Sequence, residues 1–179
     1  GYDTYRVPVG LTKEEVLTRQ REVFAGHVRV ARRVNKPLVI HVRDAYEEMI
    51  ETLRYEQASG QATLRGVIHC YISNWKNAEQ FLELGMYLGF TGIITFPPKK
   101  SDPAAQEALL EVVKKAPLDR MLLETDAPYL APGKYRGKRS EPWMVSEVAR
   151  KIAEIKQIDC DEIVKITTEN AKKLFNLVF

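Results

Sequence analysis

Residues 38–44 read Leu38-Val39-Ile40-His41-Val42-Arg43-Asp44, and this stretch decides the fold. A short apolar run without polar alternation is typical of a parallel β-strand that is covered on both faces. Helical periodicity precedes it over residues 12–35, where Thr12 and Glu15 predict a capping box. A second helical pattern follows, from Asp44 as its expected cap to Gln57. The stretch is therefore predicted to be a strand between two helices.

The same alternation recurs along the rest of the chain. Strands are predicted at residues 66–71, 86–90 and 120–124, and helices at residues 77–84, 103–115 and 142–157. A short helical pair is expected over residues 160–166 and 168–177. Strand–helix units without a hairpin signal predict an α/β fold with a parallel sheet, in a single domain over residues 1–179.

Two architectures share this pattern: an open doubly wound sheet and a (β/α)8 barrel of the TIM type. A barrel needs eight units and usually ~250 residues, whereas this chain has 179. Length alone favours an open sheet or an incomplete barrel.

The composition is that of a globular chain: 27 Lys+Arg against 24 Asp+Glu give a net charge of +3, and 45% of residues are hydrophobic. This excludes a disordered, collagenous or coiled-coil protein. The apolar runs are far shorter than the ~20 residues that span a bilayer, and we expect no membrane association and no export signal. Cys70 and Cys160 lack a C-x-x-C spacing, so neither a disulfide framework nor a zinc knuckle is indicated, and a cytoplasmic location is expected.

Three of the predicted strands end in a side chain that can bind a metal ion. His41 closes the first strand, His69 closes the second, and Asp126 follows the last. The carboxyl ends of parallel strands meet at one edge of the sheet, where α/β proteins carry their reacting groups. Imidazole nitrogens and carboxylate oxygens suit Zn²⁺, Mn²⁺ or Mg²⁺.

Each of these residues also has an ordinary structural explanation. A histidine after an apolar run is often a core residue, and Asp126, before Ala127-Pro128, suits a turn or a helix cap. His27 lies within a predicted helix and is expected to pack. Two of only three histidines at the same structural position favour a metal site.

Positive charge gathers in the loops that follow the predicted strands. Residues 134–139 (KYRGKR) carry four cations in six residues, and Arg43 directly follows His41. With Tyr129, Tyr135 and Trp143 close in sequence, these loops suit a rim that holds a phosphate backbone and stacks bases. Solvated loops and an Arg43–Asp44 ion pair are the simpler explanations. Glu141, before Pro142, is either a helix cap or a partner for Arg136 or Arg139.

Four motifs in order resemble the TatD family of metal-dependent deoxyribonucleases: residues 41–45 (HVRDA), 69–71 (HCY), 122–130 (LLETDAPYL) and 136–142 (RGKRSEP). The resemblance extends from residues 1–6 to residues 168–175. It implies a TIM-type barrel of the amidohydrolase-like kind, with divalent metal ions (Mg²⁺, Mn²⁺ or Zn²⁺) at its mouth and hydrolysis of DNA phosphodiester bonds. By motif, His41 and His69 would be metal ligands, and Asp126 both a ligand and the general base. Residues at the mouth would bind the substrate, namely Arg43, Lys138, Arg139 and Glu141.

The sequence also departs from the family pattern. The His-x-His pair of the family's first strand, and the metal-bridging Glu before the glycine that matches Gly1, do not occur in these 179 residues. Ser140 and Tyr2 replace the usual Asn and Leu. We therefore expect only about the last four β/α units of the barrel here, with ligands for at most one ion. A preceding segment of ~70–90 residues, or a second copy at the exposed sheet edges, is expected to complete it.

Three functions follow from these patterns. The leading one is a metal-dependent hydrolase of single-stranded DNA. The second is a hydrolase of the same superfamily that acts on a small ester or amide. The third is a non-catalytic fragment that keeps the fold without the chemistry.

Overall fold

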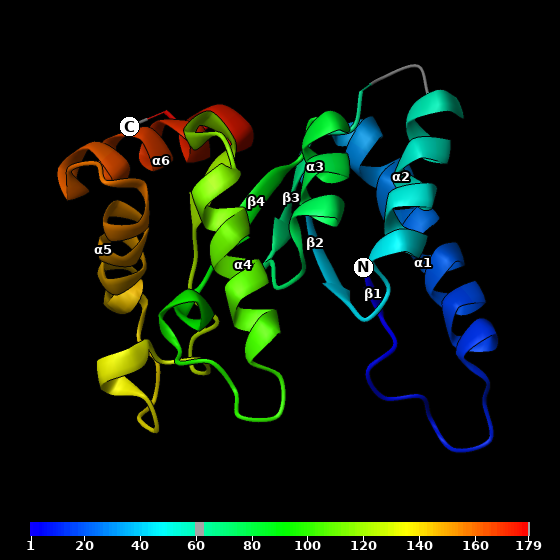
Figure 1. The fold of residues 1–179 in the computed structure, drawn as a ribbon. Coiled ribbons are helices and arrows are strands. Elements are labelled where there is room, and N and C mark those ends of the chain that lie inside the picture. The colour runs from blue at the N-terminus through cyan, green and yellow to red at the C-terminus, as the bar shows by residue number, and fades with distance from the viewer. Residues whose placement is uncertain (60–62, 179) are drawn as a thin grey trace.

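The computed structural model describes residues 1–59 and 63–178 (Figure 1). Its strands are β1 (Tyr2–Asp3), β2 (Leu38–Arg43), β3 (Gly66–His69), β4 (Tyr87–Phe90) and β5 (Met121–Leu123). Its α-helices are α1 (Lys13–Val34), α2 (Tyr46–Ser59), α3 (Trp75–Glu83), α4 (Pro103–Lys115), α5 (Val145–Lys156) and α6 (Cys160–Phe175). Short 3₁₀ turns are η1 (Gly92–Thr95), η2 (Leu118–Arg120), η3 (Gly133–Tyr135) and η4 (Pro142–Met144).

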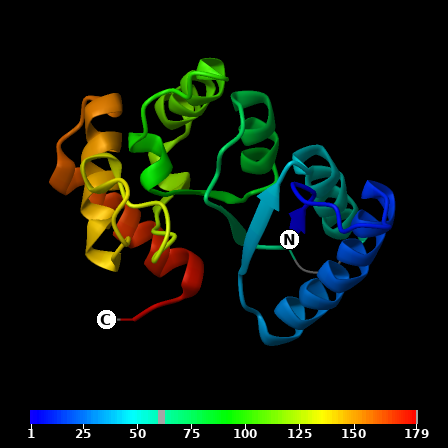
Figure 2. The same cartoon turned by 90° about the horizontal axis from the view of Figure 1, so that it is seen from below.

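The described strands form one parallel sheet in the order β1-β2-β3-β4-β5. Each strand therefore pairs with the next strand along the chain. A doubly wound sheet reverses its strand order at a switch point, so this topology rules that alternative out. Seen from below, α1 to α5 follow one another around the strands, from α1 in blue to α5 in orange (Figure 2). This winding is consistent with the wall of a TIM-like barrel.

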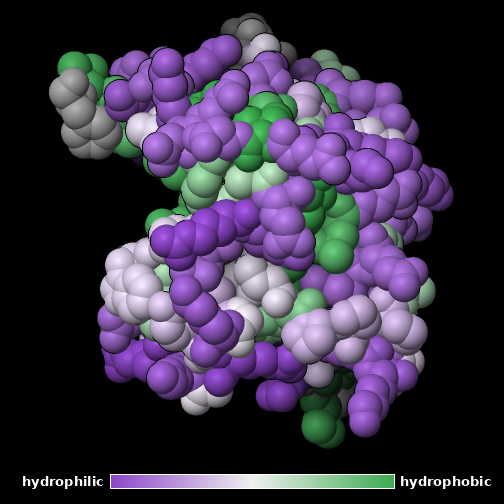
Figure 3. Space-filling view, turned by 60° about the vertical axis from the view of Figure 1, so that its left-hand side comes forward, coloured by the Kyte–Doolittle hydropathy of each residue, from purple (hydrophilic) through white to green (hydrophobic). Residues whose placement is uncertain are grey.

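Side chains alternate between the two faces of the sheet, as the period of a strand requires. Ile40, Ile68, Leu88 and Met121 are buried in the main core together with residues of the helices. The opposite face carries Val67, Tyr87 and Leu122, which pack with Leu174 of α6. One side of the molecule is hollowed, and hydrophobic surface shows in the depth of the hollow beside a hydrophilic rim (Figure 3).

Several local predictions are confirmed. Thr12 and Glu15 form the predicted capping box of α1. On α2 the apolar side chains Met49, Ile50 and Leu53 are buried. No helix in the described ranges is both long and apolar enough to cross a membrane.

Other local predictions are wrong, each for a local reason. The strand predicted to reach residue 71 stops at His69, because Cys70 takes a left-handed φ of 48°. Asp44 does not cap α2: it has a φ of 55°, lies two residues before the helix, and its carbonyl accepts the Thr4 hydroxyl. The helical pair predicted at the C-terminal end is one continuous helix, α6. α3 begins before the predicted residue 77, because the side chain of Asn74 caps it.

The outward face of α1 differs from the sequence-based expectation. Val16, Phe24 and Ala31 are buried as expected, but Val23 and Val30 are at least half exposed. His27 was expected to pack, yet its ring is exposed and contacts the Val23 carbonyl at 3.0 Å. Periodicity identified the apolar stripe correctly but not how much of it is covered.

Candidate active site at the carboxyl edge of the sheet

The strand register places two histidines side by side. His41 on β2 and His69 on β3 are direct partners in the parallel ladder. Because residues paired in this way point to the same face, both imidazoles project from the same side of the sheet at its carboxyl edge. The two histidines therefore occupy equivalent positions at the ends of neighbouring strands, as the sequence predicts.

His69 lies between two carboxylates. Its Nδ1–H donates to Glu124 Oε2 at 2.8 Å, and its Nε2–H donates to Asp126 Oδ1 at 2.9 Å. These contacts raise the pKa of His69 from its ordinary 6.5 to about 9, with the Glu124 hydrogen bond as the largest cause and burial opposing it. Only a quarter of the His69 side chain is exposed, so little water competes for these bonds. The imidazole is thus held as a cation at neutral pH.

Glu124 also belongs to the site, although it is not among the residues that the motifs predict there. Besides His69, its Oε2 accepts the backbone N–H of Cys70 at 3.0 Å. Gly89 on β4 makes room for it, because a Cβ there would lie 2.2 Å from the Glu124 carboxylate. Glu124 comes two residues after the inward-facing Leu122 and two before Asp126, and this period of two is the sequence signal that could have identified it.

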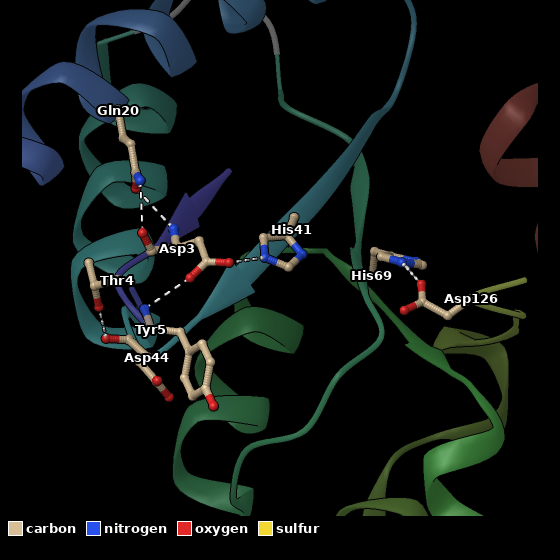
Figure 4. Close-up of polar contacts among 8 residues, drawn as sticks. All are labelled: Asp3, Thr4, Tyr5, Gln20, His41, Asp44, His69 and Asp126. Carbon is tan, nitrogen blue, oxygen red and sulfur yellow. Dashed lines mark hydrogen bonds and ion pairs between the residues drawn. The ribbon is translucent and has the colours of Figure 1, made fainter. Parts of the chain in front are cut away.

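His41 has a different partner. Its Nε2 lies 3.1 Å from Oδ2 of Asp3 on β1. Figure 4 shows the two side chains pointing toward one another. The other Asp3 oxygen accepts the Tyr5 N–H at 2.9 Å, while Gln20 of α1 bonds the Asp3 backbone. Burial opposes ionisation of Asp3, but the Tyr5 and His41 hydrogen bonds outweigh it, and its pKa is lowered. β1 is only two residues long, and periodicity does not detect a strand of that length.

The three predicted metal ligands are therefore divided between two neighbouring pairs: His41 with Asp3, which the sequence did not indicate, and His69 with Asp126 (Figure 4). Across residues 1–59 and 63–178, no three His, Cys, Asp or Glu side chains gather closely enough to hold a metal ion. The chemistry of the donors nonetheless fits a divalent ion, which would replace the proton that an imidazole shares with its carboxylate. Glu124 and Asp3 would then orient the rings, as carboxylates do for metal-binding histidines.

The predicted substrate-binding residues lie at the end of β2 and in the segment before η4. Arg43 ends β2, and its guanidinium stacks on the Tyr5 ring at 3.5 Å from the ring centroid. It forms no ion pair with Asp44 within the described ranges. The loop that carries Lys138 and Arg139 reaches the site, because the Ser140 N–H next to them donates to the Pro128 carbonyl, two residues after Asp126.

Glu141 does neither of the two things expected of it. It directly precedes η4, but its side chain forms no capping hydrogen bond. Its carboxylate instead accepts the indole N–H of Trp143, whose ring makes an edge contact with Tyr135. Glu141 therefore fixes an aromatic pair beside the basic loop.

A sequentially wound parallel sheet with imidazoles and carboxylates at its carboxyl edge defines an α/β protein with the fold of metal-dependent hydrolases, consistent with a TIM-like barrel. Comparison with known proteins agrees. Residues 1–176 match the family described as "TatD related DNase". The chain therefore belongs to the TatD family.

Individual relatives cover nearly the whole chain. It is 37% identical over 177 residues to the "Uncharacterized metal-dependent hydrolase YcfH" of Escherichia coli K12, covering 99% of this chain and 61% of the relative. It is 32% identical over 164 residues to the "3'-5' ssDNA/RNA exonuclease TatD" of Edwardsiella piscicida, covering 89% and 59%. The crystal structure of the E. coli TatD homologue YjjV superposes with a TM-score of 0.79 at 24% identity, over 96% of this chain and 62% of that one. The chain thus spans about three fifths of the length of these proteins.

Proposed function

We propose that the protein is a metal-dependent phosphodiesterase that cleaves DNA. One observation carries the proposal: two imidazoles in direct register and the carboxylate of Asp126 share one sheet edge, with cationic loops around them. The first group of residues suits a divalent ion, and the second suits a phosphodiester backbone. Membership in the TatD family supports both parts.

The proposed ligands of the ion are His41, His69 and Asp126. When bound, a divalent ion supplies Lewis acidity at phosphate oxygens and makes water a nucleophile near neutral pH. Glu124 holds Nδ1 of His69, which leaves Nε2 directed at the site. Asp126, with its carboxylate at the mouth, is the group that takes the proton from the attacking water.

The proposed substrate is single-stranded DNA. Arg43, Lys138 and Arg139 supply positive charge for phosphates. Tyr129, whose N–H donates to the Asp126 carbonyl, is 72% exposed, and Trp143, which contacts Tyr135 of the basic loop, is 52% exposed. Exposed aromatic rings stack unpaired bases, which a duplex keeps within its own stack. The Edwardsiella relative, by its name, acts on single-stranded nucleic acid with 3'-5' polarity. A single strand therefore fits this mouth better than a duplex.

The test is nucleotide release from a fluorescently labelled single-stranded oligonucleotide, with Mg²⁺, Mn²⁺ or Zn²⁺ added and with EDTA as the metal-free arm. We expect release that EDTA abolishes and that His69→Ala and Asp126→Ala each reduce by about 100-fold or more. His27→Ala is the matched control, because this histidine is exposed on α1 and, among residues 1–59 and 63–178, hydrogen-bonds only within its own helix. Release that persists in EDTA, or in both site variants, would contradict the proposal.

A second comparison separates DNA cleavage from hydrolysis of a small ester or amide. The double variant Lys138→Gln, Arg139→Gln is expected to cleave the oligonucleotide more slowly, and its cleavage should depend less on salt. Each lost phosphate contact lowers both the affinity for DNA and the dependence of that affinity on salt. If the protein hydrolyses small esters instead, the same double variant should turn over p-nitrophenyl acetate as fast as the wild type does. Equal oligonucleotide cleavage by the double variant and the wild type would favour the small substrate. Absence of both bound metal and activity would favour the non-catalytic alternative.

A further inference from the structure

A pocket of about 750 Å³ lies beside the candidate active site. It is lined by Asp3, Tyr5, Arg6, Arg43 and Tyr129. These residues come from β1 and the segment after it, from the end of β2, and from the loop after β5. Its wall is continuous with the site on both sides, because Asp3 contacts His41 and the Tyr129 N–H donates to the Asp126 carbonyl at 2.7 Å.

The cations of this pocket are positioned but not neutralised. The Arg43 guanidinium lies 3.5 Å from the centroid of the Tyr5 ring, and that of Arg6 lies 5.9 Å from it. Within the described ranges, neither guanidinium forms an ion pair with a carboxylate. The one acidic lining residue, Asp3, already accepts hydrogen bonds at both oxygens, from Tyr5 and His41. Two arginines against one engaged carboxylate give the pocket a net positive charge that suits a phosphate.

The two tyrosines of the pocket differ in what their rings contact. The face of Tyr5 is covered by Arg43, so its ring holds that guanidinium in place. Tyr129 is 72% exposed, and in the part of the chain that the structure describes it has no aromatic or cationic neighbour. An exposed tyrosine ring in the same pocket as two arginines suits a ligand with a flat ring at one end and a phosphate at the other.

We propose that this pocket binds one nucleotide unit, with its base on Tyr129 and its phosphate between Arg6 and Arg43. The inference rests on the proposed function, since it assigns the nucleotide next to the cleaved bond to a particular subsite. Tyr5 is a positioning residue here, because it acts through Arg43.

The test is isothermal titration of the whole chain in EDTA with three probes: 5'-thymidine monophosphate, thymidine and inorganic phosphate. We expect the monophosphate to bind at least about tenfold more tightly than either part alone, because base and phosphate are held together. Arg43→Gln should weaken both the monophosphate and phosphate about tenfold, whereas Tyr129→Ala should weaken the monophosphate alone. Tyr129→Phe should restore binding. Tyr55→Ala and Arg29→Gln, exposed on α2 and α1, are the matched controls.

Two results would overturn the inference: phosphate that binds as tightly as the monophosphate, or monophosphate binding that neither Arg43→Gln nor Tyr129→Ala changes. The catalytic proposal fails separately. His69→Ala is expected to abolish oligonucleotide cleavage while it leaves monophosphate binding within twofold. An inactive wild type with the expected binding pattern would refute the nuclease and keep the subsite, and an active wild type without that pattern would do the reverse.

Discussion

The position of His69 between Glu124 and Asp126 makes a quantitative prediction about the metal-free protein. Its pKa is raised in the folded state from 6.5 to about 9. The folded state therefore binds this proton more tightly than the unfolded chain does. The resulting stabilisation is complete below pH 6.5 and is lost as the pH rises through about 9. Each unit of pKa shift corresponds to about 1.36 kcal/mol, so the shift of His69 adds about 3 kcal/mol to the free energy of unfolding.

Two measurements in EDTA check this value. The first is an NMR titration that follows the ring protons of the three histidines. The variants His27→Ala and His41→Ala assign the signals to individual residues. The second is urea unfolding of the wild type and of His69→Gln, whose difference in unfolding free energy should shrink by about 3 kcal/mol between about pH 6 and about pH 10. Glu124→Gln should move the His69 pKa most of the way back toward 6.5. A wild-type His69 that titrates near 6.5, or one that Glu124→Gln leaves unchanged, would refute the reasoning.

Two further changes test what supports the site. Gly89→Ala would place a Cβ 2.2 Å from the Glu124 carboxylate. We therefore expect the His69 pKa to fall and the unfolding free energy to drop by about 1–3 kcal/mol. Gly26→Ala on α1 is the control: its new Cβ would meet only Arg29 at 3.8 Å, so this change should not destabilise the protein. Asn170→Leu would remove two donor bonds, to the carbonyls of Leu118 at 2.7 Å and Met121 at 2.9 Å, and should cost about 2–4 kcal/mol in urea unfolding. The exposed Lys173→Leu on the same helix should stay within about 0.5 kcal/mol, and equal losses for both variants would contradict the second expectation.

The sequence predicts the elements of this fold well where a local signal exists. Apolar runs identify β2 to β5, because strands buried on both faces have no polar alternation. The capping box at Thr12 marks the start of α1, since the side chains that form it are adjacent in the chain. How much of the α1 surface is buried, by contrast, does not follow from the local sequence. Whether Val23 is covered depends on which element lies against it, and the sequence of α1 does not contain that information.

The residues of the candidate site also differ in how well the sequence predicts them. The histidines are predictable because each ends an apolar run, and the edge of a parallel sheet brings such positions together. Their partners are not, because Asp3 reaches His41 from 38 residues away and Glu124 reaches His69 from 55 residues away. The contact between the Tyr5 ring and Arg43 of β2 is not predictable for a similar reason, because the two residues lie far apart in the sequence. Only the pairing of β1 with β2 brings Tyr5 and Arg43 together.

The register of β2 against β3 is itself part of the site. A shift by one residue would turn His41 and His69 to opposite faces of the sheet, because side chains alternate along a strand. The pairing begins at Leu38 and Gly66, where a Cβ on Gly66 would lie 2.6 Å from the Leu38 carbonyl oxygen. Any larger residue at this position would push the strands apart at the end where the ladder starts. A glycine three residues before His69 therefore helps to set which face the histidine occupies, and the chemistry at the carboxyl edge depends on close packing at the amino edge.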